Sequence, residues 1–304
     1  MNSYLIVSTA VTDDIWLADG IHIGSKLGGA GLYALAGLSL WCKDGMLLTG
    51  VGADFLPQYQ DWFDKNGGST KGLLVRDENT PVTNVQYSMD GERVETAKFG
   101  KDHYRKMEAS PDDIIPLMGQ AKGVYIFQSI PEGYWPRILE VKKQSGAKIL
   151  WELNARVACP TYRDDVQAIA SQCDVLSLNR REAMTMFHTD RLDVVVEKLI
   201  SWNIPMVYLR LGGEGGLIIR GGKATHTPCV PNAQVVDPTG AGNSSSAAVL
   251  YGFCEGYSDL ECGLMGSISA AMCIRQYGPP DMAEISREEV ELQLNELVQM
   301  VVGK

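Results

Sequence analysis

The residues best suited to chemistry form one short stretch, Asp237-Pro238-Thr239-Gly240-Ala241-Gly242-Asn243. Two β-branched residues, 235–236, precede it, and small and apolar residues, 244–253, follow it. This order predicts a strand end, a tight turn and a helix start. Glycines let a backbone approach a ligand closely, and the unpaired amides of a helix start favour an anion such as phosphate. The alternative is a helix that begins with small residues only for close packing.

Further polar residues and glycines stand where other strands are expected to end. Asp13 and Asp14 follow a short apolar run and could be turn residues or could face a polar ligand. The other positions are Asn154 with Arg156, Asn179 with Glu182, and Gly212-Gly213-Glu214-Gly215-Gly216. Ligands of doubly wound sheets bind outside the carboxyl ends of the strands. We therefore expect these residues to share one crevice with the stretch 237–243.

The elements that must position these residues alternate along the chain. Strands are expected at 4–7, 46–51, 123–127, 148–151, 174–178 and 206–211, with a final antiparallel pair at 217–219 and 224–226. Helices are expected at 32–41, 57–65, 135–143, 166–170, 192–202, 260–274 and 287–301. This alternation predicts an α/β fold with a doubly wound, mostly parallel sheet flanked by helices, in a single domain over residues 1–304.

Two segments predict a small second sheet. Residues 15–24 carry Asp19-Gly20 between apolar runs, and residues 80–97 alternate in polarity around Asp90-Gly91. Both patterns are typical of β-hairpins. The two hairpins are expected to form a β lid that closes over a ligand.

Composition and charge exclude several functions. The chain has 27 Lys and Arg against 37 Asp and Glu, a net charge of −10, which argues against a general nucleic-acid binder. Its seven cysteines form no Cys-x-x-Cys pair, so neither a zinc site nor a redox motif is indicated. The first residues lack the pattern of a signal peptide, and no segment reaches membrane-spanning length. We therefore expect a cytoplasmic protein that binds neither nucleic acid nor membrane.

These motifs together make the sequence resemble the ribokinase-like (PfkB) carbohydrate kinases. The stretch 237–243 is similar to the family's Asp-Thr-Thr-Gly-Ala-Gly-Asp signature, and Gly28-Gly29 before a small-residue helix is similar to its N-terminal signature. Asn179-x-x-Glu182 and the turn 211–215 resemble the family's Mg²⁺-phosphate and nucleotide elements. The matches stand in family order from about residue 4 to 280. The resemblance implies a ribokinase-like fold and ATP-dependent phosphotransfer to a hydroxyl of a small sugar or nucleoside.

The resemblance also implies an acceptor site and a donor site. The acceptor side would comprise Asp13, Asp14, Gly28, Gly29, Tyr33 and Asn154. Counting from the strand end favours Asp13 over Asp14 as the residue that holds sugar hydroxyls. Tyr33 stands where many members place a sugar-binding Asn, and it could stack on a sugar or base face or simply pack.

On the donor side, the implied nucleotide-binding residues are Asn179, Glu182, Gly212, Gly215, Asp237 and Thr239. Glu182 would hold Mg²⁺, through water, because this cation keeps much of its hydration shell. Gly240, Ala241 and Gly242, with the amide of Asn243, would form an anion hole for the transferred group. The resemblance further implies a monovalent cation near Asp237 and Thr239, and a homodimer formed through the lid.

Asn243 departs from the family pattern, because the signature ends in an Asp that serves as general base. An amide does not accept a proton usefully near neutral pH, and loss of a general base costs about two to four orders of magnitude in rate. Asn243 could belong to a branch with altered chemistry, could be engineered, or could be compensated by another carboxylate, namely Asp13, Asp14 or Asp237. Tyr33 and Ser245, which replaces a frequent Phe, also differ from the family and favour a natural departure.

Two functions remain open from the sequence. The first is a kinase that acts on a small sugar or nucleoside. The second is a catalytically impaired relative that binds nucleotide or sugar without efficient transfer. An NAD-dependent oxidoreductase is disfavoured, because the chain lacks a Gly-x-Gly-x-x-Gly fingerprint with its acidic ribose partner.

Overall fold

The computed structural model describes residues 3–89, 93–282 and 285–303. Its main sheet has nine strands in the order β13-β12-β11-β10-β9-β8-β1-β4-β5. Neighbours from β11 to β5 run parallel, and β12 and β13 are antiparallel. The bounds are β1 Tyr4–Val7, β4 Gly45–Gly52, β5 Leu73–Asp77, β8 Gly123–Gln128, β9 Lys148–Leu153, β10 Val175–Asn179, β11 Met206–Arg210, β12 Gly216–Arg220 and β13 Lys223–Thr227. The predicted mostly parallel sheet with a final antiparallel pair is confirmed.

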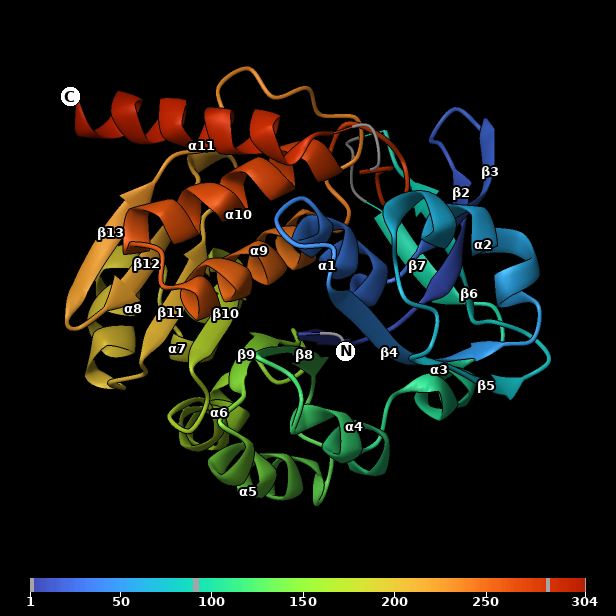
Figure 1. Ribbon diagram of the computed structural model, residues 1–304, viewed down its shortest axis with the longest axis horizontal. Helices are drawn as coiled ribbons and strands as arrows, with labels where there is room; N and C mark the ends of the chain where they lie inside the picture. Colours follow the sequence, from blue (N-terminus) through green and yellow to red (C-terminus); the bar gives the residue numbers. More distant parts are fainter. Residues whose placement is uncertain (1–2, 90–92, 283–284, 304) are drawn as a thin grey trace.

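Helices cover both faces of this sheet (Figure 1). One face carries α1 (Ala30–Ser39), α9 (Ala241–Glu255) and α10 (Asp259–Cys273), with α11 (Arg287–Val302) packed on α10. The other carries α4 (Pro111–Met118), α5 (Tyr134–Ser145), α6 (Arg163–Ala170), α7 (Arg180–Phe187) and α8 (Leu192–Ser201). Along β1, Leu5 and Val7 pack in one core while Tyr4 and Ile6 pack in the other, which is the burial expected of a central parallel strand. Across the described ranges, no helix has both the length and the apolar character to cross a membrane.

Small residues bring α1 and α9 into close contact. A Cβ at Gly37 of α1 would overlap the backbone of Ser244, and Ala36 and Ala248 are fully buried. The small residues after position 243 therefore do serve packing, as the alternative interpretation held. Gly240 and Asn243, at the start of α9, line a cavity.

A second sheet has the order β3-β2-β6-β7, formed by β2 (Val11–Trp16), β3 (His22–Gly28), β6 (Val82–Tyr87) and β7 (Arg93–Ala97). It lies beside the main sheet, next to α2 (Phe55–Asn66) (Figure 1). The predicted hairpins are the antiparallel pairs β2–β3 and β6–β7, and β2 pairs with β6 in parallel. The predicted turn at Asp90-Gly91 lies outside the described residues.

Three local expectations need correction. Asp13 and Asp14 lie within β2 and not in a turn, because the chain begins a second strand directly after β1. Residues 235–236 are not a strand: the two residues are 65% and 48% exposed, and no neighbouring strand among the described residues pairs with them. The sequence patterns also missed β5, α3 (Lys101–Met107), α4 and α7.

Candidate active site

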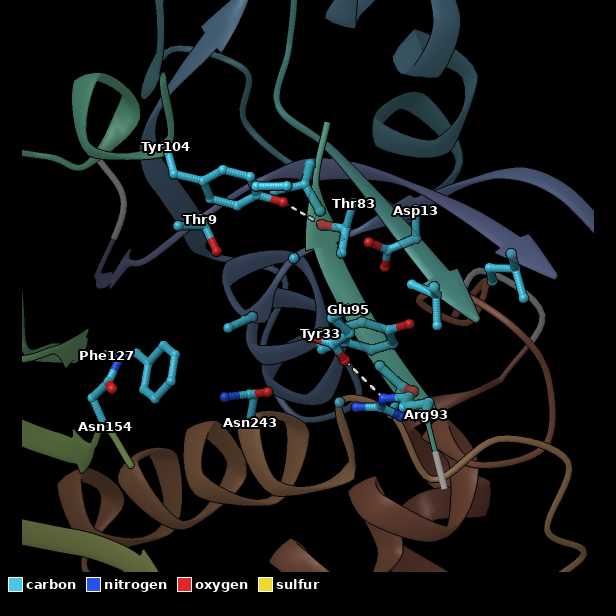
Figure 2. Close-up of a pocket in the computed structure, with 18 of the residues that line it drawn as sticks. Thr9, Asp13, Tyr33, Thr83, Arg93, Glu95, Tyr104, Phe127, Asn154 and Asn243 are labelled. Carbon is cyan, nitrogen blue, oxygen red and sulfur yellow. Dashed lines mark hydrogen bonds and ion pairs between the residues drawn. The ribbon is translucent and has the colours of Figure 1, made fainter. Parts of the chain in front are cut away.

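A cavity of about 520 Å³ lies between the second sheet and the starts of α1 and α9 (Figure 2). Among the residues predicted from the sequence, its lining includes Asp13, Gly29, Tyr33, Asn154, Asp237, Thr239, Gly240 and Asn243. Outside the lining lie Asp14, Gly28, Asn179, Glu182, Gly212, Gly215, Ala241 and Gly242. The structure therefore gathers most of the expected acceptor side with the turn before α9, and it places the other two donor-side motifs elsewhere.

Asp13 and Asp14 face opposite sides of β2 because side chains alternate along a strand. Asp13 is 8% exposed, lines the cavity and packs against Gly28, where a Cβ would overlap its carboxylate. Burial, with a smaller contribution from the charge of Glu95, raises the pKa of Asp13 to about 7. Asp14 instead makes a 2.7 Å hydrogen bond with His22 Nε2, which lowers the pKa of Asp14. Of the two, only Asp13 lines this cavity.

Tyr33 forms one wall of the cavity and packs against the turn before α9. Gly240 has a φ of 76°, and a Cβ at this position would overlap the Tyr33 ring. Glycine is therefore required here both by the left-handed backbone and by the aromatic contact. Tyr33 is 3% exposed, and its burial raises the pKa of the hydroxyl far above the usual range.

Asp237 joins the turn before α9 to the second sheet. Its Oδ1 accepts hydrogen bonds from Tyr87 OH at 2.8 Å and from the Thr239 amide at 2.9 Å. Arg93 of β7 lies 3.7 Å from the same oxygen and also donates to Thr239 Oγ1. Arg93 thus supplies the positive charge beside Asp237, and a monovalent cation there would have to share the carboxylate with a guanidinium.

Asn243 belongs to a buried polar cluster beneath the cavity. Its Nδ2 donates to Tyr125 OH and to Glu152 Oε1, each at 3.1 Å. Tyr125 OH donates to Glu152 Oε2 at 2.8 Å, and Arg210 Nη1 donates to Glu152 Oε1 at 2.7 Å. Arg210 Nη2 lies 3.7 Å from Glu182 Oε2. Burial lowers the pKa of Arg210, but these two carboxylates outweigh burial and leave the pKa raised.

The first turn of α9 offers donors without acceptors. The amides of Ala241 and Ser244 have backbone acceptors, whereas nothing in the described part of the chain accepts from the amides of Gly242 and Asn243. Arg210 lies directly against Gly242, where a Cβ would overlap Nη1. Arg210 Nε is buried and also lacks a partner among the residues described. Free amides at a helix start beside a guanidinium fit an anion.

The Asn179-x-x-Glu182 motif forms a capping box at the start of α7. Asn179 Oδ1 accepts from the Glu182 amide at 2.9 Å, and Glu182 Oε2 accepts from the Asn179 amide at 2.8 Å. Burial raises the pKa of Glu182, although Arg210 opposes this shift. A structural role therefore accounts for the spacing of the motif.

Glu182 nevertheless fits a water-mediated magnesium site. Residues 3–89, 93–282 and 285–303 contain no cluster of three or more His, Cys, Asp or Glu side chains that could hold a metal. Mg²⁺ commonly takes only one or two carboxylates and completes its shell with water and phosphate oxygens. The hydrogen bonds and ion pairs of Glu182 use Oε2, which leaves Oε1 for such a shell.

The turn at Gly212 and Gly215 lies at the end of β11. Both glycines have positive φ, 64° and 89°, and a Cβ at Gly215 would overlap the carbonyl of Thr227. Gly212 is exposed, and a Cβ there would meet no neighbouring atom of the described residues. The glycine at 215 is thus explained by backbone packing, while the space over Gly212 is open.

Sequence reasoning missed Tyr125, Glu152, Arg210 and Arg93 as site residues. Glu152 and Arg210 stand at the ends of otherwise apolar strands, and that signal could have singled them out. Nothing local distinguishes Arg93 from other charged residues, because its partners Asp237 and Thr239 are distant in sequence.

A profile of the pfkB family carbohydrate kinases matches residues 14–285. The chain belongs to this family. The predicted family is thereby confirmed, while the site residues, including Asn243 in the place of the expected Asp, stay predictions.

Several relatives of this pfkB family chain carry kinase names. It is 35% identical over 114 residues to an uncharacterized sugar kinase of Archaeoglobus fulgidus, covering 38% of this chain and 45% of that protein. It is 26% identical over 263 residues to a nucleoside kinase of Methanothermobacter thermautotrophicus, covering 84% and 82%. The chain spans about half the length of the first two curated relatives that it matches, 45% and 54%.

A solved structure shares the fold. Arabidopsis thaliana ribokinase complexed with ribose and ATP superposes with a TM-score of 0.73 at 18% identity, covering 96% of this chain and 98% of that chain. At this identity the likeness shows the fold alone. The predicted ribokinase-like fold is therefore confirmed.

Proposed function

We propose that this protein transfers a phosphoryl group from ATP to a hydroxyl of a small sugar or nucleoside. One observation carries the proposal: Asp13 and Asn243, which lies in the first turn of α9, line the same cavity. A carboxylate accepts hydrogen bonds from hydroxyls, and the amides of Gly242 and Asn243 are available to an anion. The names of the relatives, a sugar kinase and a nucleoside kinase, and the ribokinase structure with ribose and ATP support the same chemistry.

In this function each side of the cavity has its own role. Asp13 holds hydroxyls of the acceptor, Tyr33 bounds the acceptor site, and the second sheet excludes water. The free donors at Gly242, Asn243 and Arg210 stabilise the negative charge that develops on the transferred group. Mg²⁺, when it binds with the nucleotide, neutralises phosphate oxygens, and Glu182 would hold it through water.

Asn243 favours a second candidate function, binding of nucleotide or sugar without efficient transfer. The carbonyl of an amide can orient a hydroxyl but does not take its proton, and a missing base costs about 10²- to 10⁴-fold in rate. Phosphoryl transfer depends mainly on positioning and electrostatics, so a reduced rate is compatible with the first function.

A coupled ADP-release assay over a panel of sugars and nucleosides tests the proposed function. We expect release with at least one acceptor. Asp13→Asn should lower kcat/KM by about 10- to 100-fold, the usual value of a hydrogen bond to a charged group. Asp14→Asn is the matched control, because Asp14 faces away from the cavity and should leave kcat/KM unchanged.

Two outcomes would redirect this assignment. Absence of ADP release with every acceptor, combined with nucleotide binding in calorimetry, would establish the second function instead. Equal losses in Asp13→Asn and Asp14→Asn would contradict the placement of the acceptor at Asp13.

A further inference from the structure

Asn243 faces two groups that can only accept a hydrogen bond from it. Tyr125 uses its single hydroxyl proton to bond Glu152 Oε2 at 2.8 Å, so its oxygen is left to accept. Burial raises the pKa of Tyr125, which keeps that proton in place. Both oxygens of Glu152 accept hydrogen bonds as well, from Arg210 Nη1 at 2.7 Å and from Tyr125 OH at 2.8 Å. Position 243 must therefore supply a donor, and Nδ2 of the amide does so at 3.1 Å to each neighbour.

These contacts also determine where the amide oxygen lies. With Nδ2 held by Glu152, Oδ1 has no donor among the residues that the structure describes, although Asn243 lines the cavity. In Figure 2 the nitrogen of Asn243 lies on the side of Phe127 and the oxygen on the side of Tyr33. Oδ1 is thus available to a ligand hydroxyl.

The charges of the cluster disfavour a further carboxylate at position 243. Arg210 already faces two carboxylates, Glu152 at 2.7 Å and Glu182 at 3.7 Å. A carboxylate at position 243 would set an oxygen where Nδ2 now lies, 3.1 Å from Glu152 Oε1. Two buried carboxyl groups at such a distance do not both ionise readily, so one pKa rises strongly.

We propose that Glu152 is a positioning residue that holds Asn243 with its carbonyl oxygen toward the cavity, and that the negative charge of Glu152 excludes a carboxylate from position 243. In catalysis, which rests on the proposed function, Oδ1 accepts a hydrogen bond from the acceptor hydroxyl and aligns it. Moving the negative charge from position 152 to position 243 requires two substitutions together. In the double variant Asn243→Asp with Glu152→Gln, the cluster keeps the same number of carboxylates, because position 243 gains the one that position 152 loses. The side-chain amide introduced at position 152 can donate to the carboxylate at position 243.

A stability cycle tests the contact without reference to activity. Thermal unfolding is measured from about pH 5 to 8.5 for the wild type, the two single variants and the double variant. We expect Asn243→Asp to lower Tm at pH 8 by about 3 °C or more, and by less at pH 5. The introduced carboxyl has a raised pKa when folded, so the folded state binds more protons and loses stability as pH rises. In the Glu152→Gln background, Asn243→Asp should lower Tm only slightly.

A cavity control separates this contact from a general effect of charge. Asn154→Asp also adds a carboxylate to the lining, but its side chain makes no bond to Glu152 in the described structure, so Glu152→Gln should not rescue it. The inference is overturned if the Tm of Asn243→Asp equals that of the wild type at pH 8. It is also overturned if Asn243→Asp lowers Tm equally with Glu152 and with Glu152→Gln.

Activity measurements distinguish this inference from the proposed function. In the ADP-release assay at pH 7, the double variant should have a higher kcat than either single variant, with KM changed by less than about threefold. Full activity of Asn243→Asp alone at pH 7 would overturn the inference. If none of the four proteins releases ADP, the proposed function fails, while the stability cycle still decides the role of Glu152.

Discussion

At the scale of single residues, burial gives Asp13 a carboxyl that titrates near neutral pH. Its pKa is raised from 3.8 to about 7. Between these two values the folded protein binds a proton that the unfolded chain has released. The contribution of Asp13 to stability is therefore fully present at low pH and falls as pH rises toward 7.

Asp13→Asn should remove this dependence. Because the amide carries no charge at any pH, the variant should gain about 2–4 kcal/mol relative to the wild type between pH 4 and pH 8. Urea unfolding at a series of pH values measures the gain. Asp14→Asn serves as the comparison, and parallel curves for wild type and Asp13→Asn would contradict the raised pKa.

At the scale of elements, the junction of β10 and α7 shows that one motif can serve structure and ligand together. Asn179 caps α7 and Glu182 completes the capping box. A Ser side chain can replace the capping oxygen of Asn, whereas Ala cannot. Substitutions at Asn179 therefore separate the cap from any role toward nucleotide.

We expect Asn179→Ala to lose about 1 kcal/mol of stability through the missing cap, and Asn179→Ser to retain most of it. If the motif also organises Mg²⁺-bound phosphates, Asn179→Ser should still require a higher Mg²⁺ concentration than the wild type for half-maximal ADP release. Thermal unfolding measures the loss of stability, and a Mg²⁺ titration of ADP release measures the Mg²⁺ requirement. Equal instability of both variants would show that the cap depends on more than a side-chain oxygen.

The same scale shows what sequence patterns can predict. Most of the alternating strands and helices after residue 120 were predictable because their periodicity is local, but α7 was missed. Residues 235–236 were predicted wrongly, because β-branched residues indicate strand preference without revealing whether a partner strand exists. The parallel pairing of β2 with β6 was not predictable, since it depends on contacts between distant segments. Asp13 could be proposed for the cavity because it follows a predicted strand. Arg93 could not, since its role depends on contacts with Asp237 and Thr239, which are distant in sequence.

At the scale of the whole molecule, the cavity exists because two sheets meet across the turn before α9. Tyr87 of β6 and Arg93 of β7 both contact Asp237, which is 2% exposed. The second sheet is therefore bound through Asp237 to the turn before α9, where the proposed anion site begins. This arrangement couples the position of the sheet to the site where phosphate would bind.

Arg93→Ala should loosen this attachment while leaving the main sheet intact. Losing a charged donor to Asp237 and Thr239 should raise the acceptor KM by about tenfold, because the second sheet covers the acceptor less often. Hydrogen exchange should become faster in β6 and β7 and stay unchanged in β8 and β9, since local openings follow local contacts. Arg105→Ala is the matched control: Arg105 lines the same cavity, but its ion pair is with the exposed Asp102 of its own helix. Unchanged exchange in β6 and β7 after Arg93→Ala, or equal acceleration in Arg105→Ala, would contradict the coupling through Asp237.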